Sequence, residues 1–170
     1  MGYTQDVHMA RFISPNQFAF SAGTWTPTVA SDVLTMVRSA ADASFTAMIP
    51  ININSNSIPL KGSKLVSIDI WYAIGTKDAD DFATVDLNKV VYSPDDTAPS
   101  AAAVDITLDT GHDSAAERKV QDSDHCITIT LTTPAWLDDG DFYWVELIVD
   151  CADTTVFTFH GARANFTLRV

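Results

Sequence analysis

The chain has 170 residues, of which 46% are hydrophobic, and it carries a formal net charge of −12. This length suits one domain with a real core, and the apolar fraction argues against disorder. Ten Lys and Arg face 22 Asp and Glu. Nucleic acids and anionic membranes both require basic protein surfaces, so the composition excludes both as expected partners.

The beginning of the chain, MGYTQDVHMARF, lacks the apolar segment of a secretory signal. No stretch approaches the roughly 20 apolar residues of a membrane-spanning helix. We therefore expect synthesis in a cytoplasm without secretion. Cys126 and Cys151 are accordingly expected to be reduced thiols rather than a disulfide.

Period-two alternation of apolar and polar residues predicts a series of antiparallel strands. Residues 1–44 are expected to form an N-terminal arm and the first strands, at Phe18–Phe20, Thr24–Thr28 and Val33–Arg38. The remaining strands are expected at Phe45–Ile53, Val66–Ile74, Phe82–Tyr92, Val104–Leu108, Ile127–Thr132, Phe142–Val149 and Ala162–Val170. A single domain over residues 1–170 accommodates all of them.

One short helix interrupts this pattern. Ser114 and Glu117 form a capping box, which predicts a helix near residues 114–120, in the connection before Cys126. About nine or ten strands with one short helix predict an all-β fold, an antiparallel β-sandwich of the jelly-roll type.

The strand expected at Phe142–Val149 is apolar on both faces. Successive side chains of a strand point to opposite faces. One face comprises Tyr143, Val145, Leu147 and Val149. Trp144 and Ile148 lie on the other face, beside Glu146. Since the core needs only one apolar face, we predict that Trp144 and Ile148 bury against another element, preferentially a second subunit.

Two further tryptophans are candidates for contact residues. Trp71 lies on the polar side of its strand, and Trp136 follows Pro134 in an expected loop. Outward tryptophans are enriched at protein interfaces and also serve as platforms for sugar rings. The alternative is that they are large core or rim residues covered by the N-terminal segment.

Metal-binding and catalytic motifs are missing from the sequence. His112, His125 and His160 share no spacing that favours joint metal coordination, so no metal or cofactor is predicted. Asp138, Asp139 and Asp141 are interpreted as turn residues, with a Ca²⁺ or Mg²⁺ site as the alternative.

No Gly-x-Ser-x-Gly motif is present, and neither cysteine lies in a recognised nucleophile motif. The sequence therefore predicts that the protein is not an enzyme.

Three segments are similar in pattern to jelly-roll virion proteins of tailed bacteriophages, namely head decoration (cement) proteins and related head or tail fibre modules. The segments are LKGSKLVSIDIWYAIGTKDADDFATVDLNKVV, HDSAAERKVQDSDHCITITL and DFYWVELIVDCADTTVFTFHGARANFTLRV. This resemblance covers roughly residues 45–170. It implies a homotrimer assembled on a capsid lattice in the host cytoplasm, with the major capsid protein or another virion protein as partner.

Three hypotheses follow from these observations. The first is a non-enzymatic, trimeric decoration protein of a phage virion. The second is a carbohydrate-binding β-sandwich that uses Trp71, Trp136 or Trp144 for stacking. The third is a metal-dependent cupin-like enzyme, which the lack of a close histidine pair disfavours.

Overall fold

The computed structural model describes residues 5–52, 62–92, 98–138 and 140–169. In that part of the chain the strands of the N-terminal half are β1 (Asp6–Ile13), β2 (Ala19–Phe20), β3 (Trp25–Ala30), β4 (Val33–Arg38), β5 (Ala43–Ile51), β6 (Ser63–Gly75) and β7 (Asp81–Val91). The strands of the C-terminal half are β8 (Ser100–Val104), β9 (Ile106–Leu108), β10 (Asp122–Trp136), β11 (Asp141–Cys151) and β12 (Val156–Arg169). A 3-10 helix, η1 (Pro15–Gln17), and one α-helix, α1 (Ala115–Arg118), complete the elements.

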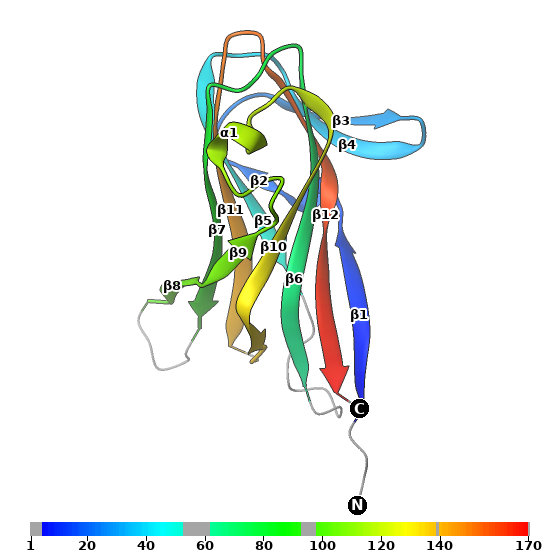
Figure 1. The fold of residues 1–170 in the computed structure, drawn as a ribbon, viewed down its shortest axis with the longest axis vertical. Coiled ribbons are helices and arrows are strands. Elements are labelled where there is room, and N and C mark those ends of the chain that lie inside the picture. Colours follow the sequence, from blue (N-terminus) through cyan, green and yellow to red (C-terminus); the bar gives the residue numbers. More distant parts are fainter. Residues whose placement is uncertain (1–4, 53–61, 93–97, 139, 170) are drawn as a thin grey trace, which may run out of the picture.

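The strands form two antiparallel sheets packed face to face (Figure 1). The seven-stranded sheet has the order β3-β4-β12-β6-β10-β9, with β1 also paired to β12. The five-stranded sheet has the order β2-β5-β11-β7-β8. The orders β4-β12-β6-β10 in one sheet and β5-β11-β7-β8 in the other are those of a jelly roll, which confirms the predicted fold class.

The core lies between the sheets and is built from the inward residues of each strand. Tyr143 is 3% exposed, and Val145, Leu147 and Val149 are fully buried, as the alternation in β11 predicted. On the other sheet, Ile68, Ile70 and Tyr72 of β6 are also fully buried. The apolar faces of the two sheets thus meet as in other sandwiches.

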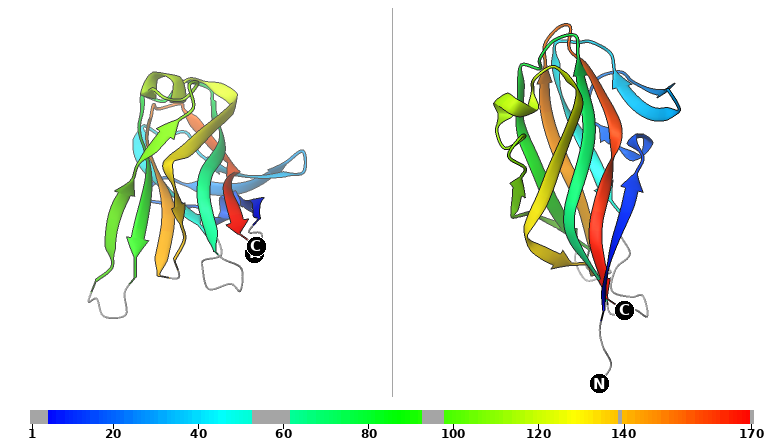
Figure 2. Two further views of the ribbon diagram at one scale, coloured as in Figure 1. Left: turned by 60° about the horizontal axis from the view of Figure 1, so that its bottom comes forward. Right: turned by 45° about the vertical axis from the view of Figure 1, so that its right-hand side comes forward.

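The hairpin of β3 and β4 extends away from the sandwich (Figure 2). Its two-residue turn consists of Ser31 and Asp32, with φ of 49° and 65°, a conformation in which both residues lie in the left-handed region. Val33, which follows the turn, is 49% exposed. Val33–Arg38 pairs with β3 as a strand, as predicted, although its apolar spacing also suits a helical turn.

The short helix α1 is fixed to the sandwich by a buried arginine. Ser114 caps it as predicted, its hydroxyl accepting a hydrogen bond from the Glu117 amide. Arg118 is 4% exposed and donates to the carbonyls of Phe82, Ala83 and His112 at 2.8–3.0 Å. These bonds compensate the loss of water around the guanidinium and hold the connection against β7. None of the described helices is long and apolar enough to cross a membrane.

Candidate functional site

Two β-bulges face each other across the C-terminal part of β6. In β12 the register slips between Phe159 and Gly161, beside Tyr72 and Trp71. In β10 it slips between Asp122 and His125, on the other side of β6. Bulges bend a strand and redirect its side chains, and they are enriched near functional sites. Here they flank a single strand from both sides and open the sheet's outer face around Trp71.

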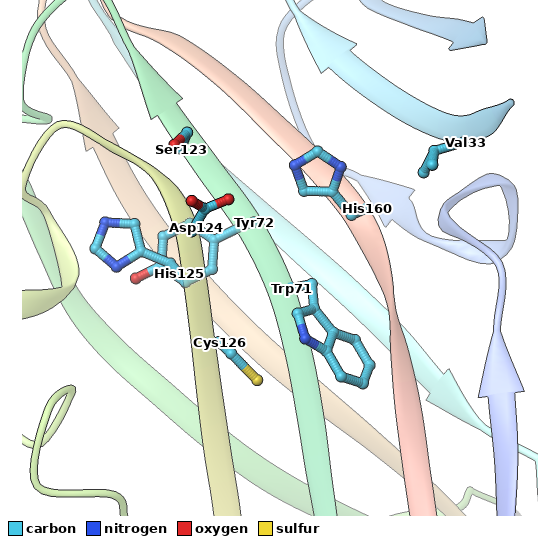
Figure 3. Close-up of a pocket in the computed structure, with 8 residues that line it drawn as sticks. All are labelled: Val33, Trp71, Tyr72, Ser123, Asp124, His125, Cys126 and His160. Atoms are coloured by element: carbon cyan, nitrogen blue, oxygen red, sulfur yellow. The ribbon is translucent and has the colours of Figure 1, made fainter. Parts of the chain in front are cut away.

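A hollow of about 430 Å³ lies at these bulges (Figure 3). Its lining comprises Val33, Trp71, Tyr72, Ser123, Asp124, His125, Cys126 and His160. Asp124 comes from β10 and His160 from β12, and the Trp71 indole lies between these two strands (Figure 3). Val33 borders the hollow from the β3–β4 hairpin. Polar side chains therefore stand on both banks of an aromatic floor.

The hollow continues along β6 into a second one of about 420 Å³. Ser123 lines both, so the two form one elongated depression, which we call the trough. Its far part is floored by the small residues Ala73 and Gly75 and bordered by Asp122 and Thr158. Small residues on the floor keep this part open, and the trough therefore suits an extended ligand.

At the other end of the trough, Asp69 holds an arginine against Trp71. Asp69 Oδ2 accepts hydrogen bonds from Arg163 Nε at 3.0 Å and Nη2 at 2.7 Å, and from Asn165 Nδ2 at 2.9 Å. The Arg163 guanidinium carbon lies 5.3 Å from the centre of a Trp71 ring, in the range of a cation–π contact. Asp69 thereby holds the Arg163 cation beside the indole.

Burial and hydrogen bonding act in opposite directions on the Asp69 carboxyl. Burial raises its pKa, but the bonds from Asn165, Arg163 and Thr128 outweigh this, and the pKa lies below its ordinary value. Asp69 is only 6% exposed. It is therefore a structural anion of the site, already occupied by donors, rather than a group available to a ligand.

Two side chains at the bulges, those of His160 and Cys126, have pKa values shifted toward their neutral forms. Burial lowers the pKa of His160, with Asp124 opposing the shift. Burial also raises the pKa of the Cys126 thiol. At neutral pH His160 accordingly offers a neutral imidazole that can both donate and accept hydrogen bonds, and Cys126 stays a thiol.

Behind the hollow, the fold brings two histidines together. His112 Nε2 lies 3.1 Å from His125 Nδ1, and His112 Nδ1 lies 2.7 Å from Asp109. His125 Nε2 lies 2.8 Å from the Val120 carbonyl, which can only accept. The sequence spacing gave no sign of this contact.

The paired histidines bond to each other rather than to an open coordination site. Among the described residues, no group of three or more His, Cys, Asp and Glu is arranged to hold a metal ion. Of the aspartates proposed as an alternative metal site, Asp141 forms an ion pair with Lys89 at 2.7 Å and Asp138 lies beside it in the turn. Asp139 lies outside the described residues.

The other predicted contact residues lie away from the trough. Trp144 is half-buried on the outer face of the five-stranded sheet, in an apolar groove of about 280 Å³. The groove is lined by Gln17, Ala19, Met48, Pro50, Val90, Tyr92, Phe142 and Trp144. Ile148, on the same face, is 38% exposed. Trp136 belongs to the end of β10 rather than to a loop, and it is 37% exposed with Lys64 Nζ 5.4 Å from its ring. The three tryptophans thus do not form one platform.

No protein-family model and no curated protein matches the chain. Solved structures similar to it include a low-affinity xylan-binding module from Roseburia intestinalis, at 11% identity and a TM-score of 0.31, over 95% of this chain and 94% of the module. An agarase is 10% identical with a TM-score of 0.33, over 88% of this chain and 22% of the agarase. Winged bean acidic lectin, complexed with methyl-α-D-galactose, is 9% identical with a TM-score of 0.33, over 99% of this chain and the whole lectin. Similarity at this level carries nothing about ligands, so the function is argued from the trough.

Proposed function

We propose that the protein is a non-enzymatic glycan-binding β-sandwich and that the trough along β6 is its binding site. The observation that carries this proposal is the half-buried Trp71 between polar banks. A sugar ring presents an apolar face of C–H groups and a rim of hydroxyls. An indole with a hydrogen-bonding side chain on either side complements both features. Asp124 and His160 supply those side chains.

The charges of the trough favour a neutral glycan over an anionic one. Asp122 and Asp124 border it, and the positive charge of Arg163 is already paired with Asp69 at 2.7 Å. The whole chain is also strongly acidic, with a formal net charge of −12. Uronic acids and sulfated sugars would meet an unfavourable potential on approach. Neutral chains with free hydroxyls would not.

We propose binding rather than hydrolysis because of where the carboxylates lie. Glycoside hydrolysis commonly uses two carboxyl groups that flank the scissile bond. Asp122 and Asp124 both come from β10, on one bank, and the opposite bank presents His160 and Thr158. Asp69 is held by its four hydrogen bonds. The arrangement positions hydroxyls instead of supplying an acid and a base across a bond.

The test is titration calorimetry with neutral oligosaccharides selected on a glycan array, comparing the wild type with Trp71→Ala and Trp144→Ala. Trp144 is the matched control because it is half-buried on the opposite sheet. Loss of the stacking platform should weaken binding about tenfold or more, equivalent to about 1.4 kcal/mol, while Trp144→Ala binds as the wild type does. A wild type that binds no neutral glycan, or a Trp71→Ala variant with unchanged affinity, refutes the proposal.

A structural role in a virion is the second candidate function. The apolar groove around Phe142 and Trp144, together with the exposed Ile148, provides the outward apolar surface that this role requires. The phage resemblance, the trimer and a capsid partner remain predictions. A mass in solution of three chains that falls to one chain in Trp144→Ser favours this candidate; a monomeric wild type counts against it.

A further inference from the structure

The strands at the sheet edges differ in how they are protected against pairing with another chain. Unpaired backbone groups of an edge strand are a template for association, which proteins block with proline, charge, bulges or short length. Among the described residues, β3 contains Pro27, and β1 carries His8 and Arg11 on its exposed surface. The edge strands β2 and β9 have only two and three residues.

Within Ser100–Val104, β8 has none of these protections, and Pro99 and Asp105 lie just outside it. Its sequence is Ser-Ala-Ala-Ala-Val, its first four residues are exposed, and it pairs with β7 in a regular register from Ser100 to Val104. In the described structure it is hydrogen-bonded to β7 on one side and forms the end of the five-stranded sheet. None of its five residues is charged. Nothing in its composition opposes a second strand.

We propose that two copies of this chain associate through β8, whose edges pair antiparallel across a two-fold axis at Ala102. A second copy is the fitting occupant because an antiparallel pair of identical strands is self-complementary. Ala101 then lies opposite Ala103 of the partner subunit, and small methyl groups meet without steric conflict. The seam also brings no carboxylate of this acidic chain against another.

The symmetry of this seam fixes how the two binding faces are directed. Antiparallel strands within one continuous sheet are related by an axis perpendicular to that sheet. Both seven-stranded sheets therefore lie on the same side of the joined five-stranded sheets. The two troughs open in a common direction, and the two apolar grooves lie on the opposite side. If the trough binds glycans, which rests on the proposed function, the dimer binds a glycan surface bivalently.

Sedimentation across the micromolar range tests the seam, with two variants of opposite charge. Ala101→Lys/Ala103→Lys and Ala101→Glu/Ala103→Glu each place like charges opposite one another across the axis, which is destabilising. Each variant should dimerise at least tenfold more weakly than the wild type, while an equimolar mixture of the two recovers dimers. Ala30→Lys, the same change at an exposed alanine of the edge strand β3, is the control and should leave dimerisation unchanged.

Several results overturn the proposal. The first is a wild type that keeps the mass of one chain, 18.5 kDa, at high micromolar concentration. The second is that either charged variant alone still forms dimers as the wild type does. The third is that mixing the two variants restores no dimers. Dimers lost in Trp144→Ser but retained in the charged variants would assign the contact to the groove instead. The seam is measured without any glycan, so its outcome is independent of the proposed function. The wild type should dissociate from a glycan-coated surface more slowly than either charged variant. All three proteins should bind a soluble oligosaccharide with equal affinity.

Discussion

Replacing Asp69 by Asn should reduce both the stability of the seven-stranded sheet and the order of the trough. The substitution keeps the shape of the side chain but removes the charge that Arg163 and Asn165 share at Oδ2. Hydrogen bonds to a charged group contribute about 1.5–3 kcal/mol each when buried. Arg163 is half exposed, with 47% of its side chain accessible, so water screens part of this loss. We therefore expect the free energy of unfolding to fall by about 1–2 kcal/mol at neutral pH.

The size of that loss should depend on pH in a defined direction. The pKa of Asp69 in the folded protein lies below its ordinary value, so its ionised form stabilises the fold above the unfolded pKa. This contribution disappears as the pH falls through the lower, folded-state pKa. Urea denaturation of the wild type and Asp69→Asn should therefore give a gap in free energy that is full at neutral pH and shrinks in acid.

Asp86→Asn provides the control, since Asp86 is an exposed carboxylate in a strand of the other sheet. Its free energy of unfolding should stay within about 0.5 kcal/mol of the wild type, as for most surface changes. A gap for Asp69→Asn that is as large in acid as at neutral pH would contradict the ionic origin of the effect. The variant should also bind glycans more weakly than the wild type, because Arg163 is no longer held beside Trp71.

Two other outcomes are expected. Gly161→Ala should lower the free energy of unfolding, measured by chemical denaturation, by about 1–3 kcal/mol. The reason is that Gly161 has a φ of 130° and an added Cβ would lie 2.5 Å from the Phe12 ring. An unchanged free energy of unfolding would contradict this strain. Thiol titration of unfolded, unreduced protein should find both Cys126 and Cys151, which are free in the structure, and a disulfide would leave none.

The strands with one buried face were predictable because burial imposes alternation on the sequence. β11 is the clearest example, with Tyr143 and Leu147 inward and Trp144 and Ile148 outward. β1 was missed as a separate strand because all its residues but Ile13 are exposed, which leaves no alternation to detect. Backbone pairing with β12 creates this strand, and such pairing has no local signature.

Three other features could not be predicted because they depend on how distant segments of the chain pair or pack. The segment Val104–Leu108 was expected to be one strand, but the chain crosses between the sheets at Asp105, which separates β8 from β9. Trp71 was identified as an outward residue from its position in the alternation. The hollow beside it was not predictable, since it depends on the bulges of β10 and β12 meeting across β6. The contact between His112 and His125 likewise depends on how the connection folds back.

The same difference in register explains why the two outer faces suit different partners. β11 pairs without a slip with β5 from Ala43 to Ile51, and its residues Asp141 to Ile148 pair without a slip with β7, so the outer side chains around Trp144 form an apolar groove. In the other sheet, slips on both sides of β6 separate the neighbouring strands and expose a polar-sided trough over Trp71. Exposing an apolar groove to water is unfavourable, and contact with another protein removes this exposure. An aromatic floor with polar side chains on both sides can instead exchange its bound waters for sugar hydroxyls. Glycan contact is therefore expected on the seven-stranded sheet and protein contact on the five-stranded sheet, where the β8 edge also lies.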